Sequence, residues 1–277
     1  MNIVFFGTPE FARIILERLA LSDFKPLLVL GSRNKIPLEK IRAMEVDLII
    51  VAAYGRILTK DILDLPKYGA LNIHPSLLPK YRGPSPIQYT ILNGDKMTGV
   101  TIIKMGEEID HGDIVSCIKY QVLGDETTDV LSRRLAKIGS ELLVETIRKW
   151  IAGAIKPTPQ THSEATYTKI IRKEDAHINW NKSAEEIARQ IRAFTPWPGS
   201  YFFWKDKRIK TISGNILDIS TPQELLPGQT FLHNSKLAVQ TPKGIFVIEE
   251  LQLQGKNKIT IKEFLNGYEE IIGAVLL

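Results

Sequence analysis

Cysteine is almost absent from this sequence of 277 residues, which contains only Cys117. No disulfide can therefore form within the chain, and a reducing, cytoplasmic setting is expected. The hydrophobic content of 44% is sufficient for a sizeable core without such bridges. Cys117 stands inside an apolar strand pattern, so we predict that it is a core residue and not a nucleophile.

Long hydrophobic runs are also missing. No apolar stretch approaches the roughly 20 residues that span a bilayer, so no membrane contact is expected. The first residues, MNIVFFGTPEFARI, lack a basic leader, and Pro9 and Glu10 interrupt their short apolar run. This pattern is not typical of a signal peptide.

Several common catalytic and nucleotide-binding motifs are absent as well. There is no G-x-S-x-G elbow, and the five histidines lack metal-ligand spacing, so no metal site is expected. The turn FGTPEFA contains one glycine and matches neither G-x-G-x-x-G nor a P-loop. The formal net charge of +5 is mild, and it allows an anionic partner without indicating one.

The first half of the sequence alternates short apolar runs with amphipathic segments. The apolar runs, typical of strands buried on both faces, lie at residues 2–7, 27–31, 47–55, 70–74, 98–105 and 113–122. Helical spacing of apolar residues predicts helices near residues 9–20, 38–45 and 127–153. This alternation predicts an α/β fold with a Rossmann-like, open and mostly parallel sheet.

The pattern changes after residue 155. The segment Ile155–Lys169 is polar and contains two prolines, which is typical of a linker, and a helix is predicted at Ala184–Ala193. Beyond Tyr201 the runs are short and alternate apolar with polar residues, which predicts a small antiparallel β-barrel. We therefore predict an α/β domain at 1–155, a linker and bridging helix at 156–198, and a β-barrel at 199–277.

Two polar side chains stand two residues apart at the end of a predicted strand, in LNIHPSLLPKYRG. Asn72 and His74 therefore share one face at the carboxyl end of that strand, where ligands bind in open α/β sheets. A lone histidine there most often only caps the strand. The segment GEEIDHGD (106–113) also follows a predicted strand. Most such acidic clusters are solvated loops, but Asp110 can reach His74 if the two strands are parallel neighbours.

An asparagine, a histidine and an aspartate together suit acyl transfer to an amine without a covalent enzyme intermediate. When an amine attacks a carbonyl, negative charge develops on the oxygen, and Asn72 and a protonated His74 can donate hydrogen bonds to it. Asp110 can raise the pKa of the histidine and assist the loss of a proton from the amine or from a water molecule.

Longer motifs carry a resemblance to a known family. FFGTPEFA, AAYGRIL, LNIHPSLLPKYRGPSPIQ, GVTIIKM with IDHGD, and RAFTPWPG occur in this order over nearly the whole chain. Together they closely resemble the methionyl-tRNA formyltransferase family. The Asn-x-His and Asp set alone indicates only the wider group that uses 10-formyltetrahydrofolate, and the loop SLLPKYRG, RAFTPWPG and the β-rich tail narrow it.

The resemblance implies roles for particular residues. Asn72, His74 and Asp110 match the family's catalytic triad. Residues that match the folate site are Ser76, Leu77, Leu78 and Pro79, and the match of Ile57 and Leu58 implies a main-chain contact to the pterin. Formyl transfer from 10-formyltetrahydrofolate to the amino group of methionyl initiator tRNA, by a protein expected to be a monomer, is the implied activity.

The resemblance also implies that the C-terminal half is an OB-like barrel that binds tRNA. Basic residues that suit phosphate contacts there are Lys205, Lys207, Arg208 and Lys210. Family members usually carry a long basic loop after the second strand, but here GSRNKIPLEKIRAMEVDLII runs almost directly into the next strand. Arg33 and Arg42 are among the few cations left to replace that loop.

Other activities remain open from the sequence. An amino-sugar nucleotide formyltransferase uses the same donor and often has shorter loops, so the short segment after Gly31 favours it, whereas RAFTPWPG and the basic tail do not. A glycinamide ribonucleotide formyltransferase is disfavoured by the first turn, which lacks a glycine-rich phosphate loop. A formate-releasing hydrolase needs no large C-terminal half, and a non-catalytic folate- or tRNA-binding protein needs no complete triad.

Overall fold

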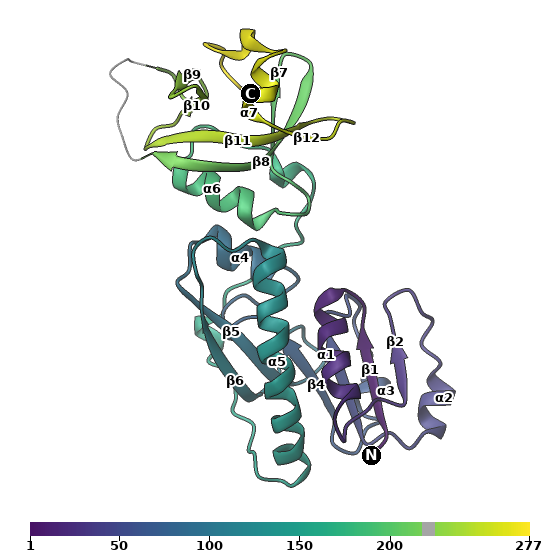
Figure 1. Ribbon diagram of the computed structural model, residues 1–277. Coiled ribbons are helices and arrows are strands. Elements are labelled where there is room, and N and C mark those ends of the chain that lie inside the picture. Colours follow the sequence, from purple (N-terminus) through teal and green to yellow (C-terminus); the bar gives the residue numbers. More distant parts are fainter. Residues whose placement is uncertain (218–224) are drawn as a thin grey trace. The chain divides into compact units, whose positions relative to one another are not determined.

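The computed structural model describes residues 1–217 and 225–277, and their contacts divide them into two compact units (Figure 1). The N-terminal unit comprises residues 1–90, 95–124 and 130–170, and the C-terminal unit comprises 91–94, 125–129 and 171–277. The main division thus falls at Ile170, later than the boundary predicted at 155. The cause lies in residues 158–168, whose backbone hydrogen-bonds to Ile114 and Arg82 of the N-terminal unit.

The N-terminal unit is built on one six-stranded sheet. Its strands, in spatial order, are β2 (Leu28–Leu30), β1 (Ile3–Gly7), β3 (Leu48–Ala52), β4 (Ala70–His74), β5 (Met97–Lys104) and β6 (Ile114–Gln121). The first four strands are parallel, as predicted for a Rossmann-like sheet. The expectation that residues 98–105 form a parallel neighbour of β4 is wrong, because β5 pairs antiparallel with β4, and β6 pairs antiparallel with β5.

Helices cover both faces of this sheet. They are α1 (Glu10–Ala20), α2 (Leu38–Ala43), α3 (Lys60–Leu63), α4 (Pro86–Leu92), α5 (Thr128–Ile151) and the 3-10 helix η1 (His162–Glu164). Helix α5 packs closely on β4 and β5 at Gly139, where a Cβ atom would lie 3.1 Å from the side chain of Val100 and 3.4 Å from that of Ile73. Since side chains alternate along a strand, Asn72 and His74 point to the opposite face of the sheet from α5.

Cys117 does not lie in the core. It is exposed on β6, which is the edge strand of the sheet. The apolar pattern around it was misleading because an edge strand can leave one face in solvent.

The C-terminal unit is a curled antiparallel sheet packed on a helix (Figure 1). Its strands run in the order β7 (Tyr201–Trp204), β8 (Lys207–Leu217), β11 (Ile245–Leu253), β10 (Lys236–Gln240) and β9 (Thr230–His233), and β12 (Lys258–Thr260) pairs with β11. The helices are η2 (Glu174–Ala176), α6 (Ala184–Ala193), α7 (Ile261–Leu265) and η3 (Glu269–Ile271). The predicted β-rich, barrel-like architecture is confirmed.

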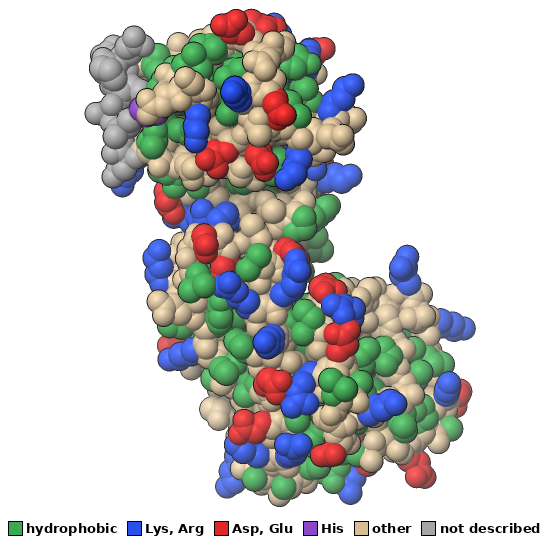
Figure 2. All heavy atoms as spheres, in the orientation of Figure 1, with side chains coloured by type: hydrophobic (Ala, Val, Ile, Leu, Met, Phe, Trp, Pro, Cys, Tyr) green, Lys and Arg blue, Asp and Glu red, His purple; other side chains and the backbone are tan. Residues whose placement is uncertain are grey.

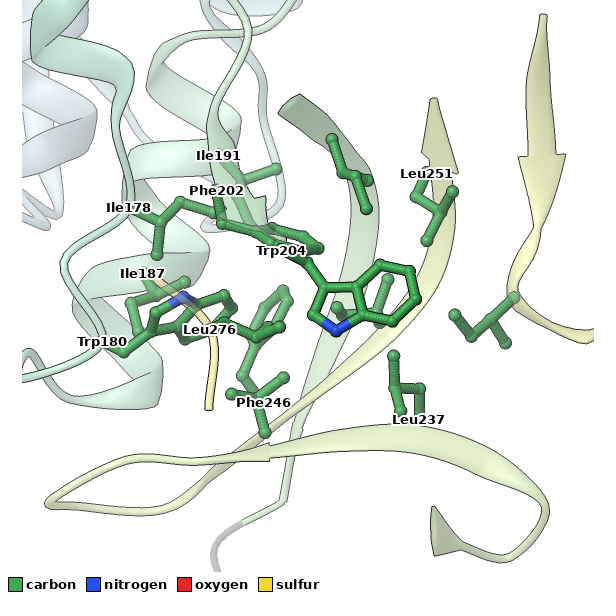
Figure 3. Close-up of a cluster of buried hydrophobic side chains, with 14 of the residues drawn as sticks. Ile178, Trp180, Ile187, Ile191, Phe202, Trp204, Leu237, Phe246, Leu251 and Leu276 are labelled. Carbon is green, nitrogen blue, oxygen red and sulfur yellow. The ribbon is translucent and has the colours of Figure 1, made fainter. Parts of the chain in front are cut away.

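A core of its own stabilises the C-terminal unit. Figure 3 shows aromatic and aliphatic side chains from α6 and the sheet gathered around Phe202, Trp204 and Phe246. Trp180 packs edge-on against Phe202, with the ring centroids 5.8 Å apart. Burial of these aromatic and aliphatic side chains supplies hydrophobic stabilisation to this unit.

Two features are absent from the described residues. None of the helices in residues 1–217 and 225–277 combines the length and the hydropathy needed to cross a membrane. Within the same residues, no group of three or more histidine, cysteine or acidic side chains is placed to hold a metal ion.

Candidate active site

The structure brings Asn72, His74 and Asp110 together. Asn72 and His74 stand on one face at the end of β4, and the carboxylate of Asp110 lies beside both side chains. Asn72 Nδ2 donates to Asp110 Oδ1 at 3.2 Å, and His74 Nδ1 lies 3.5 Å from the same oxygen. The side chains of His74 and Asp110 are only 5% and 10% exposed, so their interaction is weakly screened by solvent.

The orientation of the His74 ring is fixed by a main-chain contact. Its Nε2 lies 2.9 Å from the carbonyl oxygen of Tyr81. Since a carbonyl oxygen can only accept, Nε2 carries a hydrogen and donates to it. The remaining nitrogen, Nδ1, faces Asp110 and is the atom that can take up or release a proton.

Asp110 reaches the site by a route that the sequence did not predict. Because β5 is antiparallel to β4, its last residue pairs with Leu71, near the beginning of β4. The loop after β5 must therefore turn back toward His74. Asp110 adopts a left-handed conformation, with φ of 57°, and its Oδ2 accepts from the amide of Gly83 at 2.8 Å.

The predicted folate-binding residues form the loop directly after β4. Ser76 and Leu78 are buried, whereas Leu77 and Pro79 are half-buried. The amide of Ser76 donates to His74 O, and that of Leu78 donates to Thr101 Oγ1. These two amides are already bonded within the protein, so they are not available to donate to a ligand.

The other predicted pterin contacts differ in their exposure. Ile57 is 69% exposed, while Leu58 is 3% exposed and packs with Tyr54 in the core of the N-terminal unit. The hydroxyl of Tyr54 is buried, and none of the described residues hydrogen-bonds to it. Both residues follow β3 and therefore lie at the carboxyl edge of the parallel strands, where the triad also lies.

The basic residues predicted to bind tRNA have different surroundings. Lys205 and Lys207 form exposed ion pairs with Glu270 and Asp206, and Arg208 stacks on Tyr201 with its guanidinium carbon 3.7 Å from the ring centroid. Lys210 is half-buried on the same strand, β8. In the N-terminal unit, Arg33 and Arg42 are exposed, and Arg42 pairs with Glu39.

The sequence did not predict four residues that contact Asn72, His74 or Asp110, or that hold a residue that does. The main chain of Tyr81 and Gly83 bonds His74 and Asp110, and the side chain of Gln160 donates to the carbonyl oxygen of Asp110 at 2.8 Å. Arg82 is 1% exposed and holds Gln160. The segment KYRG lies close enough to the triad to suggest Tyr81 and Gly83, but Gln160 lies in the predicted linker and gives no local signal.

Two family models match the chain, one in each half. The family model described as formyl transferase matches residues 18–147, and the model of the formyl transferase C-terminal domain matches residues 170–269. A methionyl-tRNA formyltransferase of Thermodesulfovibrio yellowstonii is 37% identical over 96% of each chain. The chain belongs to the methionyl-tRNA formyltransferase family. A second family member, from Blochmanniella floridana, is 44% identical over 83% of this chain and 73% of its own length.

Solved structures share the fold of this family member. A methionyl-tRNA formyltransferase from Clostridium thermocellum matches with a TM-score of 0.64 over 90% of this chain and 99% of its own, at 20% identity. HypX from Aquifex aeolicus in complex with tetrahydrofolic acid matches with a TM-score of 0.74 over 98% of this chain and 48% of its own, at 18% identity. An N-formyltransferase from Helicobacter canadensis, with folinic acid and dTDP-3-aminofucose, matches with a TM-score of 0.71 over 94% of this chain and 100% of its own, at 20% identity.

Proposed function

We propose that the protein transfers a formyl group from 10-formyltetrahydrofolate to the amino group of methionyl initiator tRNA. The observation that carries the proposal is the carboxylate of Asp110, held within 3.5 Å of both Asn72 Nδ2 and His74 Nδ1 at the end of β4. Relatives at 37% and 44% identity that are named methionyl-tRNA formyltransferases support the choice of acceptor. A cytoplasmic location and a monomeric state remain parts of this proposal.

Without an enzyme, attack of an amine on a formyl group is slow because negative charge must develop on the carbonyl oxygen. The three side chains are suited to stabilise that charge. Asn72 has two amide hydrogens, and Asp110 takes one, which leaves the other for that oxygen. His74 Nδ1 can accept a proton from the attacking amine, and a proton returned to the folate N10 lets tetrahydrofolate leave as its bond to the formyl carbon breaks. The adjacent Asp110 carboxylate stabilises the imidazolium that results, as a buried acidic partner does in other acyl-transfer sites.

The residues around the triad fit a folate donor. 10-Formyltetrahydrofolate supplies the formyl carbon. The flat pyrimidine ring of a tetrahydropterin needs an apolar wall beside polar groups, and the half-buried Leu77 and the exposed Ile57 lie on loops at the carboxyl edge of the sheet. Titration of tetrahydrofolate into the protein, with Leu77→Asp as a variant, tests this part independently of the acceptor.

For the tRNA we propose a surface on the outer face of the C-terminal sheet. Strand pairing places five residues in one row across it: His177 beside Tyr201, then Lys210, Gln252 and Lys258. The rings of His177 and Tyr201 stack with centroids 5.3 Å apart. His177 is exposed, while Tyr201 is buried. Lysines beside the exposed imidazole ring suit nucleic acid, because the cations bind phosphate and the ring can stack on an unpaired base.

The test of the acceptor is a turnover assay. 10-Formyltetrahydrofolate is offered with charged initiator tRNA and, separately, with a panel of amino-sugar nucleotides. Formylated tRNA alone is the expected product. A formylated sugar alone would show that the acceptor is an amino-sugar nucleotide. The short segment after Gly31 favours this alternative, and it closes on itself through a hydrogen bond from the Gly31 amide to Asn34 Oδ1.

His74→Ala tests the chemistry in the same assay. We expect kcat to fall by about 10²–10⁴-fold, the range for loss of a general acid–base residue. The variant should still fold, since loss of the hydrogen bond to the buried Tyr81 carbonyl oxygen costs about 1–3 kcal/mol, which thermal unfolding measures. His233→Ala, in the C-terminal unit, is the matched control and should retain activity. Near-normal formylation by His74→Ala would contradict the triad.

A further inference from the structure

Arg82 is the largest fully buried side chain of the described residues, and no acidic side chain pairs with it. All five of its N–H groups nevertheless have an acceptor. Nε and Nη2 donate to Gln160 Oε1 at 3.1 and 2.7 Å, and Nη1 and Nη2 reach His111 Nε2 and His162 Nδ1 at 2.9 Å. The fifth donates to the hydroxyl of Tyr167 at 3.1 Å.

This arrangement fixes the direction of the Gln160 amide. A guanidinium group can only donate, so the side-chain oxygen of Gln160 must face Arg82 and its nitrogen must face away. The nitrogen donates to two main-chain carbonyl oxygens, Asp110 at 2.8 Å and Gly112 at 2.7 Å. Gln160 is 4% exposed, and the hydrogen-bonding capacity of its amide is filled by these four contacts.

The same loop that carries Arg82 holds the triad from the other side. The carbonyl of Tyr81 accepts from His74, and the amide of Gly83 donates to the Asp110 carboxylate. Asp110 is thus held at its carboxylate by Gly83 and at its main chain by Gln160. Because its backbone is in a left-handed conformation that non-glycine residues rarely adopt, it needs such support from its surroundings.

We propose that Gln160 is a positioning residue for formyl transfer: Arg82 orients its amide, and the amide holds the Asp110 loop so that the carboxylate stays beside His74. Gln160 does not touch the reacting atoms and acts through Asp110. The expected effect on kcat rests on the proposed function, whereas the expected effect on the surroundings of His74 does not.

Gln160→Glu tests the role of the amide nitrogen. The glutamate keeps an acceptor for Arg82 and adds a charge that pairs with it, but it presents an oxygen instead of a donor to the two carbonyl groups. We expect kcat to fall about 10- to 100-fold, as small displacements of catalytic groups do, with KM for both substrates within about twofold. The midpoint of thermal unfolding should be retained. Gln121→Glu, the same substitution at the exposed end of β6, is the control.

The imidazole nitrogen signals of His74, followed by NMR, give a readout that needs no acceptor. They should shift in Gln160→Glu and not in Gln121→Glu. Unchanged kcat, or unchanged His74 signals, would overturn the proposal, as would a parallel rise of KM. If wild-type protein does not formylate tRNA, the proposed function fails while the NMR comparison still decides the role of Gln160. Should Gln160→Glu not fold, Gln160→Asn, too short to reach Arg82 and both carbonyls together, takes its place.

Discussion

At the scale of single residues, the Asp110 loop depends on how closely its backbone can approach β5. A Cβ atom at Gly112 would lie 1.9 Å from the carbonyl oxygen of Lys104, a distance that no side chain tolerates. Gly106, in the same loop, has nothing within 4 Å of the corresponding position. Only one of these two glycines is therefore required by packing, and it is the one held by Gln160.

We therefore expect Gly112→Ala to lower the free energy of unfolding by about 1–3 kcal/mol, the usual cost of overpacking, and to lower kcat by displacing Asp110. Gly106→Ala should change stability by less than about 0.5 kcal/mol. Urea denaturation of both variants, followed by circular dichroism, measures the difference. Equal stability of the two would show that the loop can shift without cost.

At the scale of elements, strands and helices were predictable because burial leaves a clear period in the sequence. The apolar runs of β1 and β3 and the capped helix α6 follow from local patterns, as does the shared face of Asn72 and His74. Strand direction was not predictable, since an antiparallel β5 carries the same apolar pattern as a parallel one. The contacts of Gln160 join segments some 50 residues apart, and no local pattern encodes them.

Helix α6 shows how a local pattern contributes to stability. Ser183 caps it by accepting from the Glu186 amide, and the Ser183 hydroxyl and amide donate to the Glu186 carboxylate. These hydrogen bonds, the hydroxyl's first, hold the pKa of Glu186 below its ordinary value of 4.5. A carboxyl whose pKa is depressed on folding stabilises the folded state above its ordinary pKa, and that contribution is lost as the pH falls through the folded-state pKa.

Ser183→Ala should therefore lower the free energy of unfolding by about 1 kcal/mol at pH 7. The difference from wild type should shrink as the pH falls below about 4.5, because the variant no longer holds the Glu186 carboxylate. Urea denaturation at several pH values measures it. Ser183→Thr, which keeps the capping hydroxyl, should lose much less stability. A difference in stability between Ser183→Ala and wild type that does not change with pH would contradict the role of Glu186.

At the scale of the whole molecule, the net charge is small, and the visible face carries charges of both signs. Figure 2 shows lysine and arginine side chains distributed over the visible face and mixed with acidic ones, and the net charge is only +5. We expect binding of tRNA to depend on a few well-placed cations. Arg208 and Lys210 meet this requirement better than Lys205 and Lys207, which are paired with acidic neighbours.

We expect kcat/KM for tRNA to fall as salt concentration rises, because phosphate contacts release counterions. Arg208→Ala and Lys210→Ala should each raise KM for tRNA and reduce the slope of log(kcat/KM) against log salt by about 1. Lys205→Ala is the control and should change the slope less. KM for the folate donor should stay constant in all three variants, and an unchanged slope in the first two would place tRNA elsewhere.

The support of Asp110 by Gln160 has a consequence for the order in which the chain becomes competent during synthesis. Asn72, His74 and Asp110 leave the ribosome well before Gln160, and the backbone that pairs with Arg82 extends to Thr168. A nascent chain that ends near residue 155 would hold all three catalytic side chains without the segment that fixes their geometry. Catalytic competence should therefore arise late in translation, after the strands and helices of the N-terminal sheet have emerged.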